Sequence, residues 1–167
     1  MSDDVAENVG ASAVDYDPFG GAAISRVVPT TEPQREVWLA DRLGRDASLA
    51  YNESVSFHFS GPLQIAALRE ALADLADRHE ALRSTLGADG ETLCIGTEAN
   101  LDVPMHDHSA LPPGGAEAAL QAAKRAAVET PFDLERGPLM RAEIHKLAAG
   151  EHVLVLTTHH IVCDGWS

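Results

Sequence analysis

The order of predicted elements places this chain in the α+β class (an α/β sandwich), as a mixed sheet with flanking helices. Amphipathic helical patterns alternate with short apolar runs, which is the first observation behind this prediction. The second is the pair of runs at residues 140–144 and 153–158, which a turn at 148–151 joins into a hairpin. No internal repeat, glycine-rich phosphate loop or low-complexity run occurs in the sequence.

The chain divides at about residue 28. The first 25 residues contain five acidic side chains, no basic one and few large apolar groups. Such a composition leaves little apolar area to offset the loss of chain entropy on folding. We therefore expect residues 1–27 to be an acidic flexible tail, or a docking segment for a partner protein anchored by Tyr16, Pro18 and Phe19. Residues 28–167 are expected to form a single domain.

A helix is predicted to follow the tail. Thr31 and Gln34 have the spacing of a capping box, and Pro33 lies in the first turn, where its missing N–H is harmless. The helix is expected to end near Gly44, with Trp38 as an anchor in the core.

A strand and a long helix are predicted next. Val55, Phe57 and Phe59 alternate with polar residues, which predicts a half-buried strand that ends at Gly61. Apolar residues at helical spacing then predict one amphipathic helix, with His79 as a satisfied interior group on its apolar side. The residues of that stripe are Ile65, Leu68, Leu72, Leu75, His79 and Leu82.

Further segments complete the expected fold. Residues 92–95 predict a short strand, and residues 101–115, rich in proline, glycine and aspartate, predict a loop. Residues 116–128 form an alanine-rich helical pattern that ends before Pro131. Residues 153–158 are apolar or β-branched at consecutive positions, which indicates a strand buried on both faces.

The candidate site follows that buried strand. Two adjacent histidines, His159 and His160, come where the strand ends, and Asp164 and Gly165 follow in the turn. Adjacent strand residues face opposite sides of a sheet, so only one imidazole is expected to reach a given cleft. His160 is the candidate general base because an imidazole titrates near neutral pH. Asp164 can return toward the strand end, and Gly165 permits a positive φ or a close backbone approach.

Two groups of potential metal ligands occur. The first combines the tandem histidines with Cys163 and Asp164, but neighbours that face opposite ways do not converge on one ion. The second is His106-Asp107-His108, within the predicted loop, where the sequence offers no third ligand group nearby. We expect no metal at either place and a solvated surface loop at the second.

Charge and composition narrow the classes of partner. The sequence has 26 acidic and 12 basic residues and a net charge of −14, so it would repel a phosphate backbone and nucleic acid is not expected as a partner. Only two cysteines occur, far apart, which is typical of a reduced intracellular protein. No secretory signal and no run of membrane-spanning length is present. We expect a cytoplasmic protein with no membrane partner.

Four stretches resemble condensation domains of nonribosomal peptide synthetases. Residues 158–167, THHIVCDGWS, resemble the HHxxxDG signature of that family. Residues 31–39, TEPQREVWL, resemble its opening motif, and residues 78–86, RHEALRSTL, resemble its second motif, RHExLRTxF. Residues 132–142, FDLERGPLMRA, resemble the segment that leads into the hairpin before the histidines. The order of these motifs makes the resemblance specific over residues 28–167.

The resemblance implies a two-lobe domain, each lobe similar to chloramphenicol acetyltransferase, with residues 28–167 as its N-terminal lobe. It implies an enzyme that forms an amide between a donor acyl or peptidyl thioester and the amine of an acceptor aminoacyl thioester. Both substrates would be tethered to phosphopantetheine on peptidyl carrier proteins, an upstream donor and a downstream acceptor, and no metal or diffusible cofactor is implied. The resemblance stops after the HHxxxDG signature, so we expect the C-terminal lobe to be missing and this chain alone to be inactive.

The resemblance also implies roles at the site. His160 would accept a proton from the attacking α-amine or position that amine by a hydrogen bond, and the N–H of Gly165 would lie near the developing oxyanion. Two alternatives stay open. One is a starter condensation domain or a coenzyme A-dependent acyltransferase of the same superfamily, and the other is a non-catalytic module that docks carrier proteins.

His159 and Asp164 are implied to support the loop that carries the base. In the family, the aspartate of this motif is regarded as structural and is held by an arginine. Because a buried carboxylate needs a paired cation, Arg78 or Arg83 is expected to support Asp164, unless the arginine lies in the missing lobe.

Overall fold

The structure is a computed structural model that describes residues 23–164. The expected tail at residues 1–22 and the expected role of Gly165 therefore fall outside the described residues. Within the described range, no helix combines the length and the apolar character needed to cross a bilayer. The elements in chain order are β1 (Ile24–Pro29), α1 (Glu32–Asp41), α2 (Arg45–Leu49), β2 (Asn52–Ser60), α3 (Ile65–Arg78), the 3₁₀ helix η1 (Glu80–Arg83), β3 (Ser84–Leu86), β4 (Thr92–Gly96), β5 (Met105–Asp107), α4 (Gly115–Glu129), β6 (Met140–Ala148) and β7 (Glu151–His159).

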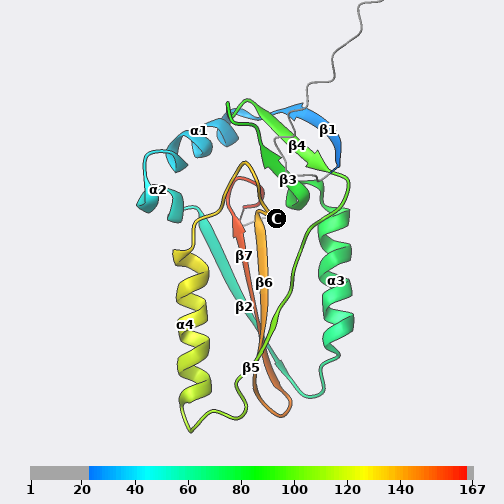
Figure 1. The fold of residues 1–167 in the computed structure, drawn as a ribbon, viewed down its shortest axis with the longest axis vertical. Coiled ribbons are helices and arrows are strands. Elements are labelled where there is room, and N and C mark those ends of the chain that lie inside the picture. The colour runs from blue at the N-terminus through cyan, green and yellow to red at the C-terminus, as the bar shows by residue number, and fades with distance from the viewer. Residues whose placement is uncertain (1–22, 165–167) are drawn as a thin grey trace, which may run out of the picture.

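The strands form two sheets. The small sheet has the order β1-β4-β3, and the large sheet has the order β2-β7-β6-β5. In the large sheet β5 runs parallel to β6, whereas the other neighbours are antiparallel. Figure 1 shows the small sheet, α1 and α2 above one end of the large sheet, which α3 and α4 flank. The predicted α+β class with a mixed sheet is confirmed.

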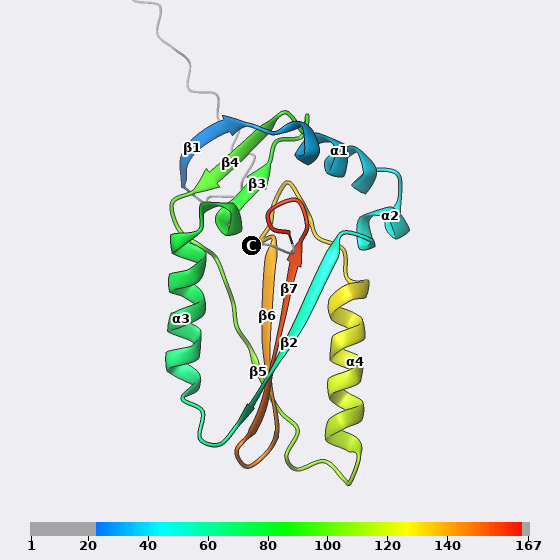
Figure 2. The same cartoon turned by 180° about the vertical axis from the view of Figure 1, so that it is seen from behind.

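One helix covers each face of the large sheet. Leu72 of α3 shares a core cluster with Leu154, while Leu120 of α4 shares another with Val153 and Val155. Seen from behind, β2 runs diagonally beside β7 between the two helices (Figure 2). Successive side chains of β7 enter opposite, covered faces, so this strand is buried on both sides, as its consecutive apolar residues predicted.

A third core cluster joins the small sheet, α1 and the end of the hairpin. Leu86, Leu139 and Ile161 are buried in it, and Trp38 of α1 packs against them. The Trp38 ring also covers Gly90, which has a φ of +72° and where a Cβ atom would lie 2.5 Å from the ring. Trp38 is half-buried, and its predicted role as an anchor for α1 is confirmed.

Strand β1 begins at Ile24, before the domain boundary that composition placed at residue 28. Residues 24–27, assigned to the tail from their composition, pair antiparallel with β4, with Val27 opposite Cys94. β3, of three residues, extends the same sheet on the other side of β4. Sequence analysis missed β1 because its ladder partner β4 lies far along the chain, and it missed β3 because three residues are too few to show an alternating pattern.

The long helix ends before its apolar stripe does. α3 stops at Arg78, and His79 is extended, with φ −105° and ψ 98°. The 3₁₀ turn η1 follows, and the Ser84 hydroxyl donates to the Glu80 carbonyl at 2.6 Å. This turn leads the chain into β3. His79 is exposed, so the prediction that it is an interior group is wrong. Leu82 lies in η1 rather than on the helix.

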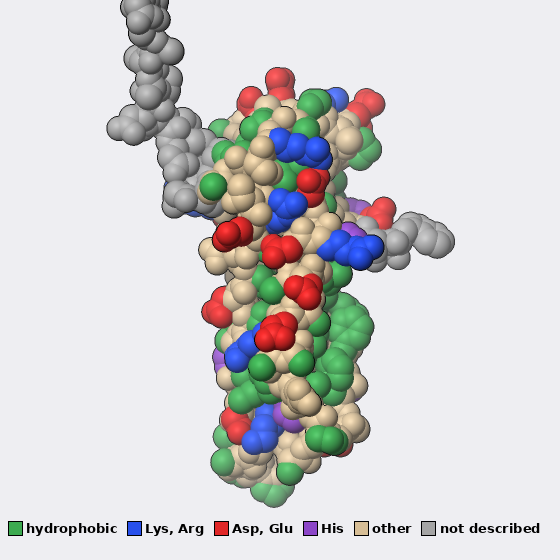
Figure 3. Space-filling model, turned by 90° about the vertical axis from the view of Figure 1, so that its right-hand side faces the viewer, with side chains coloured by type: hydrophobic (Ala, Val, Ile, Leu, Met, Phe, Trp, Pro, Cys, Tyr) green, Lys and Arg blue, Asp and Glu red, His purple; other side chains and the backbone are tan. Residues whose placement is uncertain are grey.

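The predicted half-buried strand is β2, but its apolar side is only partly covered. Phe59 packs against the cluster under α3, whereas Val55 and Phe57 are each 46% exposed. Leu75 of α3, 39% exposed, is also uncovered. Figure 3 shows hydrophobic side chains gathered along one edge of the face that α3 occupies. We call Val55, Phe57 and Leu75 the β2 apolar face.

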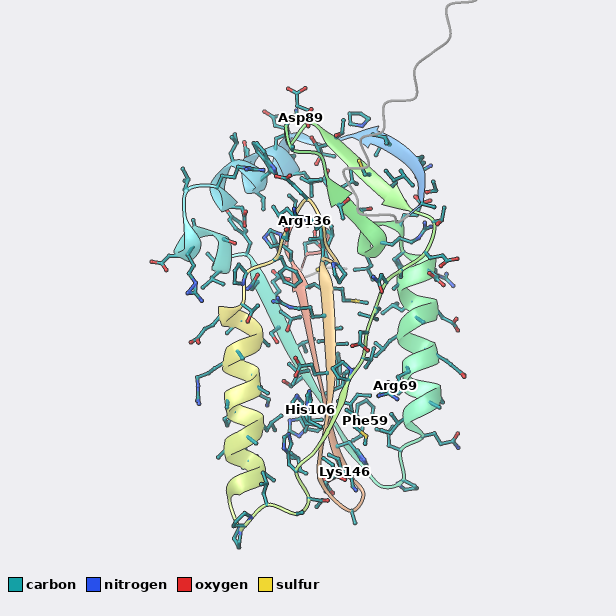
Figure 4. The ribbon with its side chains drawn as sticks, in the orientation of Figure 1. Phe59, Arg69, Asp89, His106, Arg136 and Lys146 are labelled. Carbon is teal, nitrogen blue, oxygen red and sulfur yellow. The ribbon has the colours of Figure 1, made fainter. Side chains whose placement is uncertain are left out.

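The segment predicted as a loop at 101–115 contains the short strand β5. Arg69 reaches from α3 toward this segment (Figure 4), and its Nε donates to the Val103 carbonyl at 2.9 Å. The Ile144 N–H donates to the Pro104 carbonyl at 2.9 Å. These contacts bring the segment alongside β6, where three residues pair.

Candidate active site

The N-terminus of α1 holds the turn that follows β7. The predicted capping box is present, because the Thr31 hydroxyl accepts the Gln34 N–H and the Gln34 Oε1 accepts the Thr31 N–H. The same glutamine donates through Nε2 to the Ile161 carbonyl at 3.2 Å. The helix start is therefore confirmed, and its cap also supports the candidate site.

His159 is the inward histidine of the pair. Its side chain is 0% exposed, and its ring meets the edge of Phe132 with centroids 5.8 Å apart. The Nδ1 atom accepts the Ile161 N–H at 3.2 Å, which leaves the ring proton on Nε2, 3.8 Å from the Asp41 Oδ1. Burial lowers the pKa of His159 to about 4, against the opposing effect of Asp41 and with a smaller contribution from His160. His159 is therefore neutral at neutral pH.

His160 faces outward and is 39% exposed. Its N–H donates to the Tyr51 carbonyl at 2.9 Å, and its ring stacks on that of Tyr51 with centroids 6.5 Å apart. The Nδ1 atom lies 2.7 Å from the Glu53 Oε1. The tandem histidines thus face opposite ways, as strand alternation predicted, and His160 is the exposed one of the pair.

Cys163 closes the turn. Its thiol donates to the Thr158 hydroxyl at 2.8 Å, and the Val162 N–H donates to the His159 carbonyl at 3.1 Å. Burial raises the pKa of the Cys163 thiol, so the sulfur stays protonated and acts as a donor. Cys163 has a structural task in the turn.

The expected supports of the site are only partly placed. Asp164 is exposed and lines the cavities described below, whereas Gly165 lies outside the described residues. Arg83 is 13% exposed, donates to the Gly96 carbonyl and lies 3.7 Å from Glu80, so the small sheet holds it. Arg78 is exposed at the last position of α3. An arginine partner for Asp164 therefore stays a prediction.

Two cavities meet at this turn. The larger, of about 630 Å³, runs from the turn along the β2 apolar face, and the smaller, of about 290 Å³, lies between the turn and α1 and is lined by His160. Val162, Cys163 and Asp164 line both cavities. The turn that carries His160 therefore separates two hollows.

The second group of potential metal ligands lies at the far end of the sheet, where Figure 4 shows His106. His108 Nε2 is 3.1 Å from His145 Nδ1, and His106 Nε2 is 3.5 Å from Glu143 Oε2. The prediction that no further ligand group lies near this stretch is wrong, because β6 supplies one by pairing with β5. The three rings are stacked, and within residues 23–164 no three such side chains are arranged to hold a metal ion.

Sequence reasoning missed the partners that β2 and α1 bring to the histidines. Asn52 pairs with His159 in the ladder, which places Tyr51 and Glu53 on either side of the tandem pair. A glutamate near the start of this alternating strand was the available signal. The register that brings it to His160 could not be deduced from the sequence, because the two strands are far apart in the chain.

The fold and site together define a class. The lobe carries one exposed imidazole at the end of its central hairpin, between two cavities. This arrangement fits proteins in which a histidine transfers a proton between two bound substrates. The family profile described as Condensation domain matches residues 24–167. The chain therefore belongs to the condensation-domain family, as its motifs predicted.

Relatives agree with this assignment. Chondramide synthase of Chondromyces crocatus is 41% identical over 143 residues, which are 84% of this chain and 4% of that protein. Phosphinothricin tripeptide synthetase of Streptomyces viridochromogenes is 37% identical over 144 residues, which are 84% of this chain and 13% of that protein. The chain thus spans a small part of the length of these synthetases.

Solved structures show the same fold. The starter condensation domain of rhizomide synthetase superimposes with a TM-score of 0.76 at 31% identity, over 85% of this chain and 36% of the solved one. A variant of that domain in complex with C8-CoA superimposes with a TM-score of 0.72 at 31% identity, over 82% of this chain and 31% of the solved one. The chain spans about a third of those structures.

Proposed function

We propose that this chain is the histidine-bearing lobe of a condensation domain that forms an amide between two carrier-bound thioester substrates. The observation that carries the proposal is the position of the His160 turn between two cavities, because a two-substrate reaction needs access from two sides. The donor would be an acyl or peptidyl thioester on an upstream peptidyl carrier protein. The acceptor would be an aminoacyl thioester on a downstream one, each held by phosphopantetheine.

His160 would act on the acceptor amine. The amine nitrogen forms a bond to the donor carbonyl carbon, the carbon–sulfur bond breaks, and the carrier thiol leaves. The nitrogen loses one proton, which Nε2 of His160 would accept and pass to the departing thiolate. A positioned base of this kind contributes about 10²–10⁴-fold to the rate. His159 and Asp164 would keep the turn in shape, and Gly165 would offer its N–H to the oxyanion.

A C-terminal lobe would complete the site. The exposure of His160, 39%, and of Val55 and Phe57, 46% each, supports a wall supplied by further polypeptide. Near-attack geometry requires both walls, which aim the two arms and exclude water. We therefore expect the chain alone not to form amides. The two free cysteines, Cys94 and Cys163, support the expected cytoplasmic location.

A two-lobe assay tests the proposal. The chain alone, and the chain with a separately produced C-terminal lobe, are supplied with loaded donor and acceptor carriers, and the amide is measured by mass spectrometry. We expect product only with both lobes. In His160→Ala the rate of amide formation should fall by at least about 100-fold. His58→Ala, exposed on β2, is the matched control. Product from the chain alone at the two-lobe rate would refute the need for a second lobe, and an unchanged rate in His160→Ala would remove His160 from the mechanism.

The β2 apolar face favours a second candidate, a starter condensation domain or coenzyme A-dependent acyltransferase. An uncovered apolar groove of about 630 Å³ suits an acyl chain, and one solved neighbour is in complex with C8-CoA. Octanoyl-CoA and a carrier-bound peptidyl donor, offered at equal concentration, separate the two candidates by which donor appears in the product. Carrier binding without any amide product, unchanged in His160→Ala, would instead indicate a docking module.

A further inference from the structure

A carboxylate accompanies the outward histidine. Glu53 Oε1 lies 2.7 Å from His160 Nδ1. Glu53 is the second residue of β2, and His160 directly follows β7. The ladder between β2 and β7 brings them together, since Asn52 pairs with His159 and Glu53 pairs with Thr158. The Glu53 and His160 side chains are 43% and 39% exposed, whereas the Nδ1 atom itself is buried.

Ordered segments fix this contact on both sides. The His160 N–H donates to the Tyr51 carbonyl at 2.9 Å, and its ring stacks on that of Tyr51. On β2, the Asn52 side-chain amide donates to the Val128 and Thr130 carbonyls, each at 2.9 Å, and ties the start of the strand to the end of α4. The carboxylate and the imidazole are therefore positioned by the sheet rather than by free loops.

A carboxylate at this distance selects a tautomer. Nδ1 has no hydrogen-bond partner among residues 23–164, so the contact at 2.7 Å is an ion-pair contact without the alignment of a hydrogen bond. A carboxylate this close still disfavours a lone pair on Nδ1 and favours a hydrogen there, which leaves the lone pair on Nε2. Nε2 is the atom that must accept the proton of an amine. We propose that Glu53 is a positioning residue that orients His160 and holds it in the Nδ1–H tautomer. This inference rests on the proposed function of His160 as the base for the acceptor amine.

The inward histidine provides an internal contrast. His159 Nδ1 accepts the Ile161 N–H at 3.2 Å, so its hydrogen is on Nε2. With Glu53 in the proposed role, the two adjacent imidazoles would carry opposite tautomers in their neutral forms.

The first test needs no turnover. Nitrogen NMR shifts of the ring atoms in the labelled chain report the tautomer of each neutral histidine. We expect Nδ1–H for His160 and Nε2–H for His159. Glu53→Ala should convert His160 to Nε2–H and leave His159 unchanged, whereas Glu53→Gln, whose amide oxygen still accepts, should retain Nδ1–H. Nε2–H on His160 in the parent chain, or Nδ1–H that survives in Glu53→Ala, would overturn the proposal.

The second test is kinetic and uses the two-lobe assay. Glu53→Ala should lower kcat about 10-fold to 100-fold with little change in KM for either carrier, and Glu53→Asp should recover part of the loss. Glu151→Ala is the matched control, because that carboxylate lies at the other end of β2, near Ser60. An unchanged kcat in Glu53→Ala would contradict the positioning role. If no variant and no parent forms an amide, the proposed function fails, while the NMR tautomer still decides the role of Glu53.

Discussion

The Nε2 atom of His159 and the Oδ1 atom of Asp41 face each other across 3.8 Å in the interior of the protein. Neither atom has a hydrogen-bond partner among residues 23–164. Asp41 is the last residue of α1 and His159 is the last residue of β7, so the pair exists only when helix and hairpin have come together. Because the ring is 0% exposed, placing a proton on it is unfavourable in the folded state.

Acidification should therefore destabilise the protein through His159. Burial lowers its pKa from 6.5 to about 4, so the unfolded chain binds this proton more readily than the folded one. The corresponding stability is present above about pH 6.5 and is lost as the pH falls toward about 4, a change of about 3 kcal/mol. Urea unfolding at about pH 7.5 and about pH 4.5 measures it.

Substitutions at this pair sharpen the pH test. His159→Asn should remove most of the loss between the two pH values, because no ring remains to be protonated. Asp41→Asn removes the carboxylate that opposes the effect of burial, so it should extend the loss of stability to lower pH. The same pH dependence in His159→Asn as in the parent chain would assign acid unfolding to other groups.

Gln34 should be needed both for the helix and for the turn. Gln34→Ala removes an acceptor of the capping box and the hydrogen bond to the Ile161 carbonyl, which should cost about 1–2 kcal/mol of unfolding free energy. Gln34→Glu can still accept the Thr31 N–H but cannot donate to Ile161, so faster amide exchange should be confined to the turn. Gln121→Ala, on the exposed side of α4, is the control. Equal exchange at the turn in Gln34→Glu and the parent would show that the glutamine supports the helix alone.

Gly90 should tolerate a side chain far less well than Gly114. Both have positive φ, +72° and +81°, but a Cβ at Gly90 would lie 2.5 Å from the Trp38 ring whereas Gly114 has open space. Gly114→Ala should cost about 1–2 kcal/mol for backbone strain alone, and Gly90→Ala about 1–3 kcal/mol more because Trp38 must move. Chemical unfolding gives both values, and equal costs would mean that the ring yields freely.

Phe57 should promote self-association of the chain. Its side chain is 46% exposed on an edge strand, so Phe57→Ser should change the unfolding free energy by about 1 kcal/mol or less. Sedimentation velocity over a range of concentrations should show less association in Phe57→Ser. Val128→Ser, 37% exposed on α4, is the matched control. Equal association of the two variants would place the contact surface elsewhere.

Local patterns predicted much of this fold. The capping box of Thr31 and Gln34, the alanine-rich helix and the final hairpin each depend on neighbours in sequence, and all three are present. The alternation rule also predicted that His159 and His160 would face opposite ways. These features were readable because their hydrogen bonds or periodicities close within a few residues.

Features set by long-range pairing could not be read in this way. β5 has three residues, and its ladder partner β6 lies beyond α4 in the chain. β3, also of three residues, pairs with the next strand, β4, but is too short to show an alternating pattern. His79 fits a helical stripe, but the turn after Arg78 overrides that periodicity. Glu53 reaches His160 through a strand register that depends on the whole sheet. β2 has the predicted alternation of apolar and polar residues, but its apolar side chains Val55 and Phe57 are not buried as predicted.

The hydrogen bond from Gln34 to Ile161 joins residues 127 positions apart, and this separation sets an order of assembly. During synthesis α1 emerges early, whereas the turn that its capping glutamine holds emerges after every other described element. Until then Val37 and Trp38 lack the Leu139 and Ile161 side chains against which they pack. Contacts of such high separation form slowly, so this apolar side of α1 should stay uncovered in a nascent chain until the turn after β7 has been synthesised.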